Sequence, residues 1–167
     1  MLGRTKWLYG VCIVILLISL CYNWNTHKAD DNYKANAQGD LVTGVGLVGQ
    51  ADAALRKGEL KSATILAYEG IGYIRASSGG MEQLGVRNIA GLASFLDQLM
   101  SNLLGNQPAD ATTKSHDERV ITVLENSFEP FGRINFGSID DSRLQEAVNK
   151  VYQAMTPQER QNFEGEG

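Results

Sequence analysis

Residues 7–24 read WLYGVCIVILLISLCYNW, and this stretch organises the rest of the chain. It contains no charged side chain, and between Val11 and Leu20 the one polar side chain is that of Ser19. A helix rises about 1.5 Å per residue, so this stretch spans about 27 Å, close to the thickness of a bilayer's hydrocarbon core. Aromatic residues typical of a membrane–water interface flank it on both sides: Trp7, Tyr9, Tyr22 and Trp24. The stretch predicts a single transmembrane helix, with the lipid bilayer as its partner.

Two other interpretations of this stretch remain open. One is a cleaved signal peptide, with Arg4 and Lys6 as its basic region. Its small-x-small cleavage site would be Ala35-Asn36-Ala37, which lies far beyond the apolar residues. The other is a lipoprotein, because Ile18-Ser19-Leu20-Cys21 resembles a bacterial lipobox, although Leu20 is bulky where a small residue is expected. We favour a retained anchor because neither cleavage site has both the expected form and the expected position.

Basic residues on the two sides of the span decide its expected orientation. Arg4 and Lys6 lie in the short tail at residues 1–6, whereas Lys28 and Lys34 are spread over a longer interval after the span. Under the positive-inside rule, this density favours a cytoplasmic tail. We therefore expect a location in the cell membrane, with the N-terminus cytoplasmic and the C-terminal domain extracytoplasmic.

Length and charge limit what the rest of the chain can be. Residues 25–40 are polar and unpatterned and predict a tether, and residues 41–167 suffice for one domain with a modest core. The chain has a formal net charge of −4. Its first forty residues carry four basic and three acidic side chains, which leaves −5 for the domain. A mildly acidic domain with dispersed Lys and Arg lacks a basic face, so we expect no nucleic-acid partner.

The two cysteines, Cys12 and Cys21, both lie in the predicted span. They are about half a turn out of phase on a helix, so they cannot form a disulfide within one chain. We interpret them as small apolar membrane residues. Acylation of Cys21, or a disulfide between two copies of the chain in a homo-oligomer, stays open.

The outer domain has the 3.6-residue hydrophobic period of helices, which predicts an all-α bundle of about five helices. The expected helices cover residues 41–55, 59–76, 81–104, 117–129 and 141–155. Breaks are expected at residues 56–58 and 77–80, and residues 105–116 predict an exposed loop. Thr156-Pro157-Gln158-Glu159 has the pattern of a helix start, with Thr as N-cap and Glu at the third helical position.

The segment from Met81 to Leu104 is the strongest amphipathic pattern in the chain. A second membrane span is excluded here, because Arg87 and Asp97 would each cost about 2.5–3.5 kcal/mol near the centre of a bilayer. We expect one long helix at the centre of the core. Its apolar face comprises Met81, Leu84, Leu92, Phe95, Leu99 and Leu103.

Residues 44–49 form a literal G-x-G-x-x-G motif, GVGLVG. A dinucleotide-binding site needs these glycines between a β-strand and a helix within a parallel sheet. Here a polar segment precedes them and no crossover unit follows, so we interpret them as small residues that allow close helix packing or a pliable helix start. Further on, Gly58-Glu59-Leu60-x-x-Ala63 resembles the turn inside a tetratricopeptide helical hairpin. This resemblance covers one turn and does not recur 34 residues later, so it implies a helical hairpin rather than a repeat array.

Residues typical of catalytic or metal sites are sparse. The two histidines are His27, in the predicted tether, and His116, in the predicted loop, and neither has a neighbouring cysteine or second histidine at ligand spacing. Nucleophile-elbow and Walker motifs are absent from the sequence. We expect no metal site, no cofactor and no enzymatic activity. The sequence does not exclude that two carboxylates come together in the folded structure; the candidates are Asp97, Glu118, Glu125, Asp140 and Asp141.

The segment from Pro130 to Gly137, PFGRINFG, has no helical period that would bury its large side chains on one face. Aromatic residues and arginine are enriched at the energetic centres of interfaces, so this segment predicts a partner-binding site at Phe131, Arg133, Ile134 and Phe136. Alternatively, the phenylalanines close the end of the bundle. We expect a non-enzymatic, single-pass subunit that presents a helical domain for assembly or scaffolding of a membrane or envelope complex. The alternative is an envelope sensor or regulator that acts through a membrane partner.

Overall fold

The computed structural model describes the backbone of residues 2–105 and 111–165, and the side chains of residues 15–20, 28–105 and 112–164. The elements in chain order are the α-helices α1 (Leu2–Arg56), α2 (Leu60–Gln83), α3 (Ile89–Leu103), α4 (Ala111–Phe128), α5 (Asp141–Ala154) and α6 (Pro157–Gly165), with the 3₁₀ helix η1 (Glu129–Arg133) between α4 and α5. No strand occurs among the described residues. The all-α prediction is confirmed.

The chain forms two compact units, residues 1–33 and residues 34–167. The first unit is the N-terminal part of α1, where the described side chains of residues 15–20 are all exposed. Within the part of the chain that is described, no helix is both long enough and apolar enough to cross a membrane. The predicted span at residues 7–24 falls largely outside the described side chains, which exclude residues 7–14 and 21–24.

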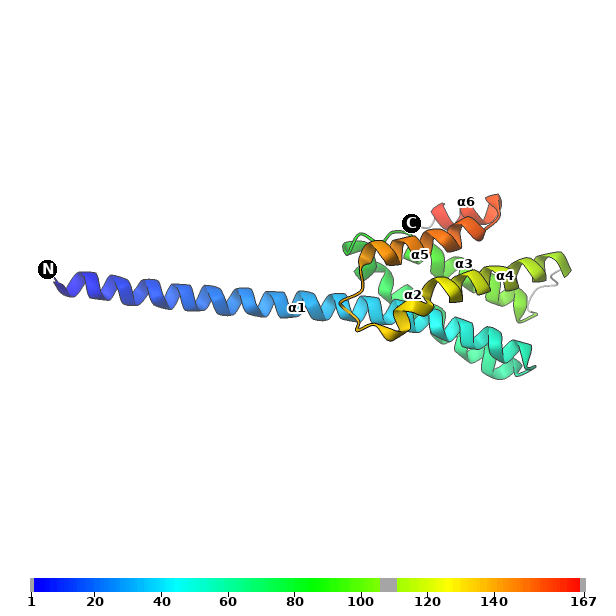
Figure 1. Ribbon diagram of the computed structural model, residues 1–167, viewed down its shortest axis with the longest axis horizontal. Coiled ribbons are helices and arrows are strands. Elements are labelled where there is room, and N and C mark those ends of the chain that lie inside the picture. Colours follow the sequence, from blue (N-terminus) through cyan, green and yellow to red (C-terminus); the bar gives the residue numbers. More distant parts are fainter. Residues whose placement is uncertain (1, 106–110, 166–167) are drawn as a thin grey trace. The chain divides into compact units, whose positions relative to one another are not determined.

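The second unit is a helical bundle around one hydrophobic core. Figure 1 shows α2 returning along the C-terminal part of α1, and α3 packs in turn against α2. Helix α4 packs against α5 and η1, and α6 packs against α3. Every α-helix contributes fully buried large side chains to this core, among them Leu41, Ile74, Leu92, Leu124, Leu144 and Phe163.

Two glycines bring α1 and α2 into close contact. A Cβ atom on Gly44 would lie 2.6 Å from the carbonyl oxygen of Gly70 and 2.9 Å from the amide nitrogen of Ile74. The reciprocal Cβ atom on Gly70 would lie 2.6 Å from the carbonyl oxygen of Gly44. The interpretation of the G-x-G-x-x-G motif as a helix-packing motif is therefore confirmed at Gly44. Gly46 faces open space.

Gly58 makes the tight turn between α1 and α2 possible. This residue has φ +78°, a left-handed conformation that glycine adopts without a Cβ penalty. The Gly58 N–H donates to the Leu55 carbonyl at 2.9 Å, and the Glu59 N–H donates to the Ala54 carbonyl at 2.9 Å. These two bonds form a Schellman motif, which satisfies carbonyls at the helix end. The predicted helical hairpin is confirmed.

The prediction of one helix over residues 81–104 is wrong. Helix α2 runs through the expected break at residues 77–80 and ends near Gly85, which has φ +83°. The Val86 N–H donates to the Met81 carbonyl at 2.9 Å, and the buried Val86 side chain turns back onto the core. Gly85 thus ends α2 with a second Schellman motif. The hydrophobic period continues on both sides of this turn, which is why the sequence predicted one uninterrupted helix. Helix α3 begins anew at Ile89.

The interval predicted as an irregular tether, residues 25–40, is helical throughout. The buried Gln38 amide explains why its last residues belong to the bundle. Gln38 Nε2 donates to the Ile139 carbonyl at 2.9 Å, and Gln38 Oε1 accepts from the Gly137 N–H at 2.8 Å. Close by, Lys34 pairs with Asp141 at 2.7 Å. Polar side chains that look like tether residues therefore hold α1 to the segment before α5.

Candidate functional site

A cleft of about 510 Å³ with several polar lining residues lies between α3, α4 and the start of α6. Helix α3 contributes amide side chains, α4 contributes an adjacent His–Asp pair, and α6 contributes a carboxylate. The lining residues that matter here are Asn102, His116, Asp117, Thr156 and Glu159. We treat this cleft as the candidate site because polar groups from three helices converge in it.

The start of α6 places Glu159 in the cleft. The Thr156 N–H donates to Glu159 Oε2 at 2.6 Å, and the Glu159 N–H donates to Thr156 Oγ at 3.3 Å. This reciprocal pair is a capping box, as the Thr-Pro-Gln-Glu pattern predicts. The box fixes the first turn of α6 and leaves the Glu159 carboxylate beside α4.

His116 meets Glu159 across the two helices. Its Nε2 lies 3.0 Å from Glu159 Oε2, and Arg119 Nη2 lies 3.4 Å from its Nδ1. Since a guanidinium only donates, Nδ1 accepts in this arrangement and Nε2 carries the proton that Glu159 accepts. Burial raises the pKa of Glu159. The hydrogen bonds from Thr156 and His116 together lower this pKa by more than burial raises it, so the net shift is downward. Glu159 is therefore a carboxylate at neutral pH.

Asp117 is a buried carboxylate in the same cleft, only 2% exposed. Asn102 Nδ2 donates to its Oδ2 at 3.5 Å, which is at the outer limit of a hydrogen bond. Burial raises the pKa of Asp117 above its ordinary value, and the contacts with Asn102 and His116 offset this only in part. One donor atom from each of His116, Asp117 and Glu159 lies within 4.8 Å of the other two. The cleft thus holds three potential metal-binding groups close to one another.

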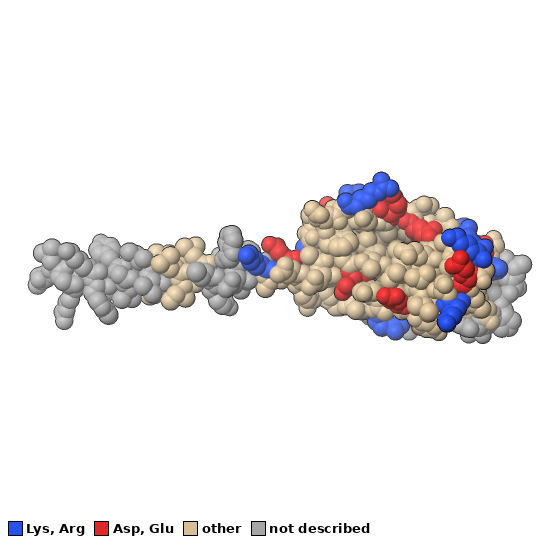
Figure 2. Space-filling view, turned by 90° about the horizontal axis from the view of Figure 1, so that it is seen from below, with Lys and Arg blue, Asp and Glu red and all other residues tan. Residues whose placement is uncertain are grey.

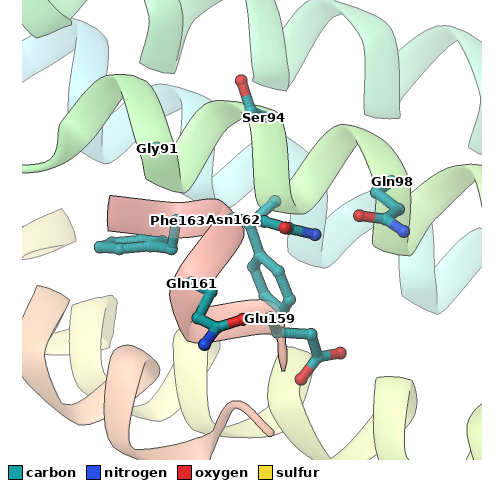
Figure 3. Close-up of a pocket in the computed structure, with 8 residues that line it drawn as sticks. Gly91, Ser94, Gln98, Glu159, Gln161, Asn162 and Phe163 are labelled. Atoms are coloured by element: carbon teal, nitrogen blue, oxygen red, sulfur yellow. The ribbon is translucent and has the colours of Figure 1, made fainter. Parts of the chain in front are cut away.

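A second cavity of about 340 Å³ lies between α3 and α6 and shares Gln98, Glu159 and Asn162 with this cleft. Figure 3 shows α6 lying against α3, close to Gly91. A Cβ atom on Gly91 would collide with the carbonyl oxygen of Phe163. Gly91 therefore allows α6 to pack closely enough on α3 to carry Glu159 to His116.

A third recess, of about 360 Å³, is apolar and lies between α1, α4 and η1. At its edge, a Cβ atom on Gly49 would lie 2.6 Å from Glu125 Oε1. Burial, followed by the charge of Asp52, raises the pKa of Glu125, while Arg56 lowers it. Arg56 itself donates to the buried Asp52 at 2.8 Å, and that bond raises the pKa of Arg56. Asp52 and Arg56 thus form an ion pair within α1, and Glu125 of α4 lies close enough for both charges to shift its pKa.

The four predicted partner-binding residues are in different environments. Phe131 belongs to the core, where its ring packs edge-on against Phe128 with centroids 5.9 Å apart. Ile134 is half-buried against the core. Arg133 is exposed and pairs with Glu129 at 2.9 Å. Phe136 is 43% exposed and lies over Gly39 of α1.

The cluster of His116, Asp117 and Glu159 was not predicted from the sequence. His116 was expected in a loop, but residues 112–116 are helical and extend α4 toward its N-terminus. Its partner Glu159 is 43 residues away and was assigned to a helix start alone. The sequence does show an adjacent His116-Asp117 and a glutamate, Glu159, at a helix start. These residues indicate a common site only when α4 and α6 are known to be neighbours.

No family model matches this chain, and neither the curated proteins nor the solved structures contain a significant match to it.

Proposed function

We propose that this chain is a single-pass membrane protein that presents its helical bundle to other proteins of a membrane or envelope complex. The supporting observation is the apolar part of α1. Five large apolar side chains there, at residues 15–18 and 20, are between 56% and 64% exposed. Successive residues of a helix are about 100° apart, so these side chains point in all directions around the axis. A helix that is apolar all round requires an apolar environment on every side, which a bilayer provides.

In this proposal the N-terminal tail is cytoplasmic and the bundle is extracytoplasmic, as the density of basic residues before the span favours. The role is binding rather than catalysis. Figure 2 shows basic and acidic side chains side by side on one face of the bundle, an arrangement that suits protein partners better than nucleic acid.

Membrane extraction tests the anchor. The full-length protein is expected to stay in the membrane pellet under alkaline wash and to have the intact mass of the complete chain. Leu17→Arg places a charge near the middle of the span, at a cost of about 2.5–3.5 kcal/mol, and should release a large fraction of the protein. Leu17→Ala, the matched control, should remain in the pellet. A soluble wild-type protein, or a mature chain beginning at Cys21 or Gln38, contradicts the proposal.

The proposed partner surface consists of the exposed Arg133 and Phe136, together with the half-buried Ile134 between them. Phe136 and Arg133 offer the aromatic and cationic groups that interfaces use most, and both are accessible. Crosslinking pull-downs from native membranes test it. Phe136→Ala and Arg133→Ala should reduce partner recovery while leaving the melting temperature nearly unchanged. Phe131→Ala, the buried control, should destabilise the bundle by about 3–5 kcal/mol instead. Full partner recovery with both surface variants would place the interface elsewhere.

The polar cleft favours a second candidate, a sensor or regulator that acts through a membrane partner. Its buried Asp117 and the His116–Glu159 pair are arranged as ligand-binding groups often are. A partner that co-purifies regardless of ligand supports the scaffold, whereas a partner whose activity changes with a ligand of the cleft supports the sensor.

A further inference from the structure

We infer that His116, Asp117 and Glu159 together bind a zinc ion in the cleft between α3, α4 and α6. This inference does not depend on the proposed membrane anchoring, since all three residues lie in the bundle.

The chemistry of the three side chains points to zinc. One imidazole nitrogen and two carboxylates are a mixed donor set, whereas calcium and magnesium prefer oxygen donors alone. Zinc binds histidine nitrogen and carboxylate oxygen at about 2.0–2.2 Å, so its ligand atoms lie about 3.4 Å from one another in a tetrahedral site. The His116 Nε2–Glu159 Oε2 separation is already 3.0 Å, and the set as a whole lies within 4.8 Å. Small rotations of the Asp117 and Glu159 side chains would therefore complete the site.

Groups around the cluster orient its ligands. The Thr156 N–H holds Glu159 through Oε2, and the Asn102 amide lies against Asp117 Oδ2. Outer contacts of this kind fix carboxylate ligands in known metal sites. To bind zinc through Nε2, His116 must move its proton to Nδ1, and Arg119 must then move away from that nitrogen. Arg119 is exposed on the surface of α4, so this movement is unobstructed by the core.

Charge and access agree with a cation. Asp117 is 2% exposed, and burying a carboxylate is costly unless a positive charge or strong hydrogen bonds compensate. A zinc ion would supply that charge to both carboxylates at once. The cleft of about 510 Å³ provides an entrance and leaves room for a fourth ligand, either water or a group from a partner. The alternative is a plain ion pair between His116 and Glu159 that only joins α4 to α6.

Zinc titration of the full-length protein tests the inference. The protein is purified in nonionic detergent, stripped with a chelator and titrated with zinc in competition with a chromophoric chelator. One zinc per chain is expected, with a dissociation constant in the micromolar range or below. Magnesium and calcium should fail to compete. Since a ligand of the folded state raises stability, zinc should also raise the melting temperature.

Three variants separate a zinc site from an ion pair. His116→Ala, Asp117→Asn and Glu159→Gln should each weaken zinc binding by about 10-fold or more, the scale of effect seen even for outer-shell changes. His27→Ala and Glu118→Gln are the matched controls, because they remove the other histidine and a neighbouring carboxylate of α4; both should keep wild-type affinity. Asp117→Asn is nearly isosteric, so it keeps the test valid if the other variants fail to fold. Cobalt, as a spectroscopic substitute, should show an absorption spectrum that is lost in His116→Ala. Absent or millimolar binding, or unchanged affinity in Asp117→Asn, would overturn the inference and leave the ion pair only.

Discussion

Residues 15–20 and residues 37–48 belong to the same helix, α1, but differ in how their apolar side chains are surrounded. In the first segment the described side chains are exposed and apolar on all sides of the helix. In the second, the buried residues recur with the helical period and include Leu41, Val45 and Val48. The same backbone conformation therefore carries two kinds of surface. A one-sided apolar stripe is satisfied by neighbouring helices of the same chain, whereas an all-round apolar surface is not.

Truncating one leucine in each segment should separate the two regions most clearly. Leu41→Ala removes a fully buried side chain and should lower the free energy of unfolding by about 2–5 kcal/mol. Leu17→Ala should change it by no more than about 0.5 kcal/mol. Chemical denaturation of the full-length protein in detergent, followed by circular dichroism, measures both. Equal effects would mean that the bundle does not use residues 37–48 as its core.

The buried amide of Gln38 tests how the second segment is held. Gln38→Ala removes the acceptor for the N–H groups of Gly137 and Ile139, and an unsatisfied buried donor costs about 1–3 kcal/mol. Asn36→Ala changes an exposed amide two residues earlier and should leave stability almost unchanged. Hydrogen exchange should accelerate at Gly137 and Ile139 in the Gln38 variant alone. Protection that survives there would show that this amide is not what joins α1 to the segment before α5.

Alanine substitutions at two glycines of the G-x-G-x-x-G motif should have opposite effects on stability. Gly44→Ala forces a Cβ atom against the backbone of α2 and should destabilise the bundle by about 1–3 kcal/mol. Gly46→Ala adds a methyl group in open space within a helix and should stabilise it by about 0.5–1 kcal/mol. Melting temperatures of the two variants check the pair. If both moved in the same direction, the close contact of α1 with α2 would be wrong.

Glu125, which lies against Gly49 of α1, should give the smallest effect. The pKa of Glu125 is higher in the folded state than in the unfolded state, so its ionisation destabilises the fold. This destabilisation is absent below the unfolded-state pKa, increases as the pH rises between the two pKa values, and reaches its full size above the folded-state pKa. Glu125→Gln should therefore raise the melting temperature at neutral pH by about 1–2 °C, and the gain should disappear below about pH 4. Glu82→Gln, at an exposed carboxylate of α2, is the control. A gain that persisted in acid would have another cause than the charge.

Local chemistry explains which parts of the fold were predictable. The hairpin at Gly58 and the Thr156–Glu159 box of α6 were predicted, and each depends on residues within a few positions of one another. The Asp140 cap of α5 is also local but was not predicted. For Asp140, the Ser142 N–H donates to Oδ1 at 2.9 Å, and the hydroxyl and N–H of Ser142 lower the pKa of the aspartate. The buried side chains of α5 include Leu144, Val148 and Val151, which recur with the helical period, and Met155 is buried at the C-cap. The Gly85 cap was equally local, but the hydrophobic period on both sides of it concealed the turn.

The all-α class, the Gly58 hairpin and the capping box of α6 are predictable from the residues alone, because propensity, hydrophobic period and capping act over one or two helical turns. That residues 34–40 belong to the bundle and that His116 meets Glu159 depends instead on how the helices pack. Gln38 is polar and looks like part of a tether until its amide finds the backbone around Ile139, 101 residues further on. His116 and Glu159, 43 residues apart, come together because α4 and α6 both pack on α3, and Gly91 allows α6 to approach. Such contacts depend on which helices become neighbours. Hydrophobic periodicity cannot predict this, because it identifies the buried face of a helix but not the helix that packs against that face.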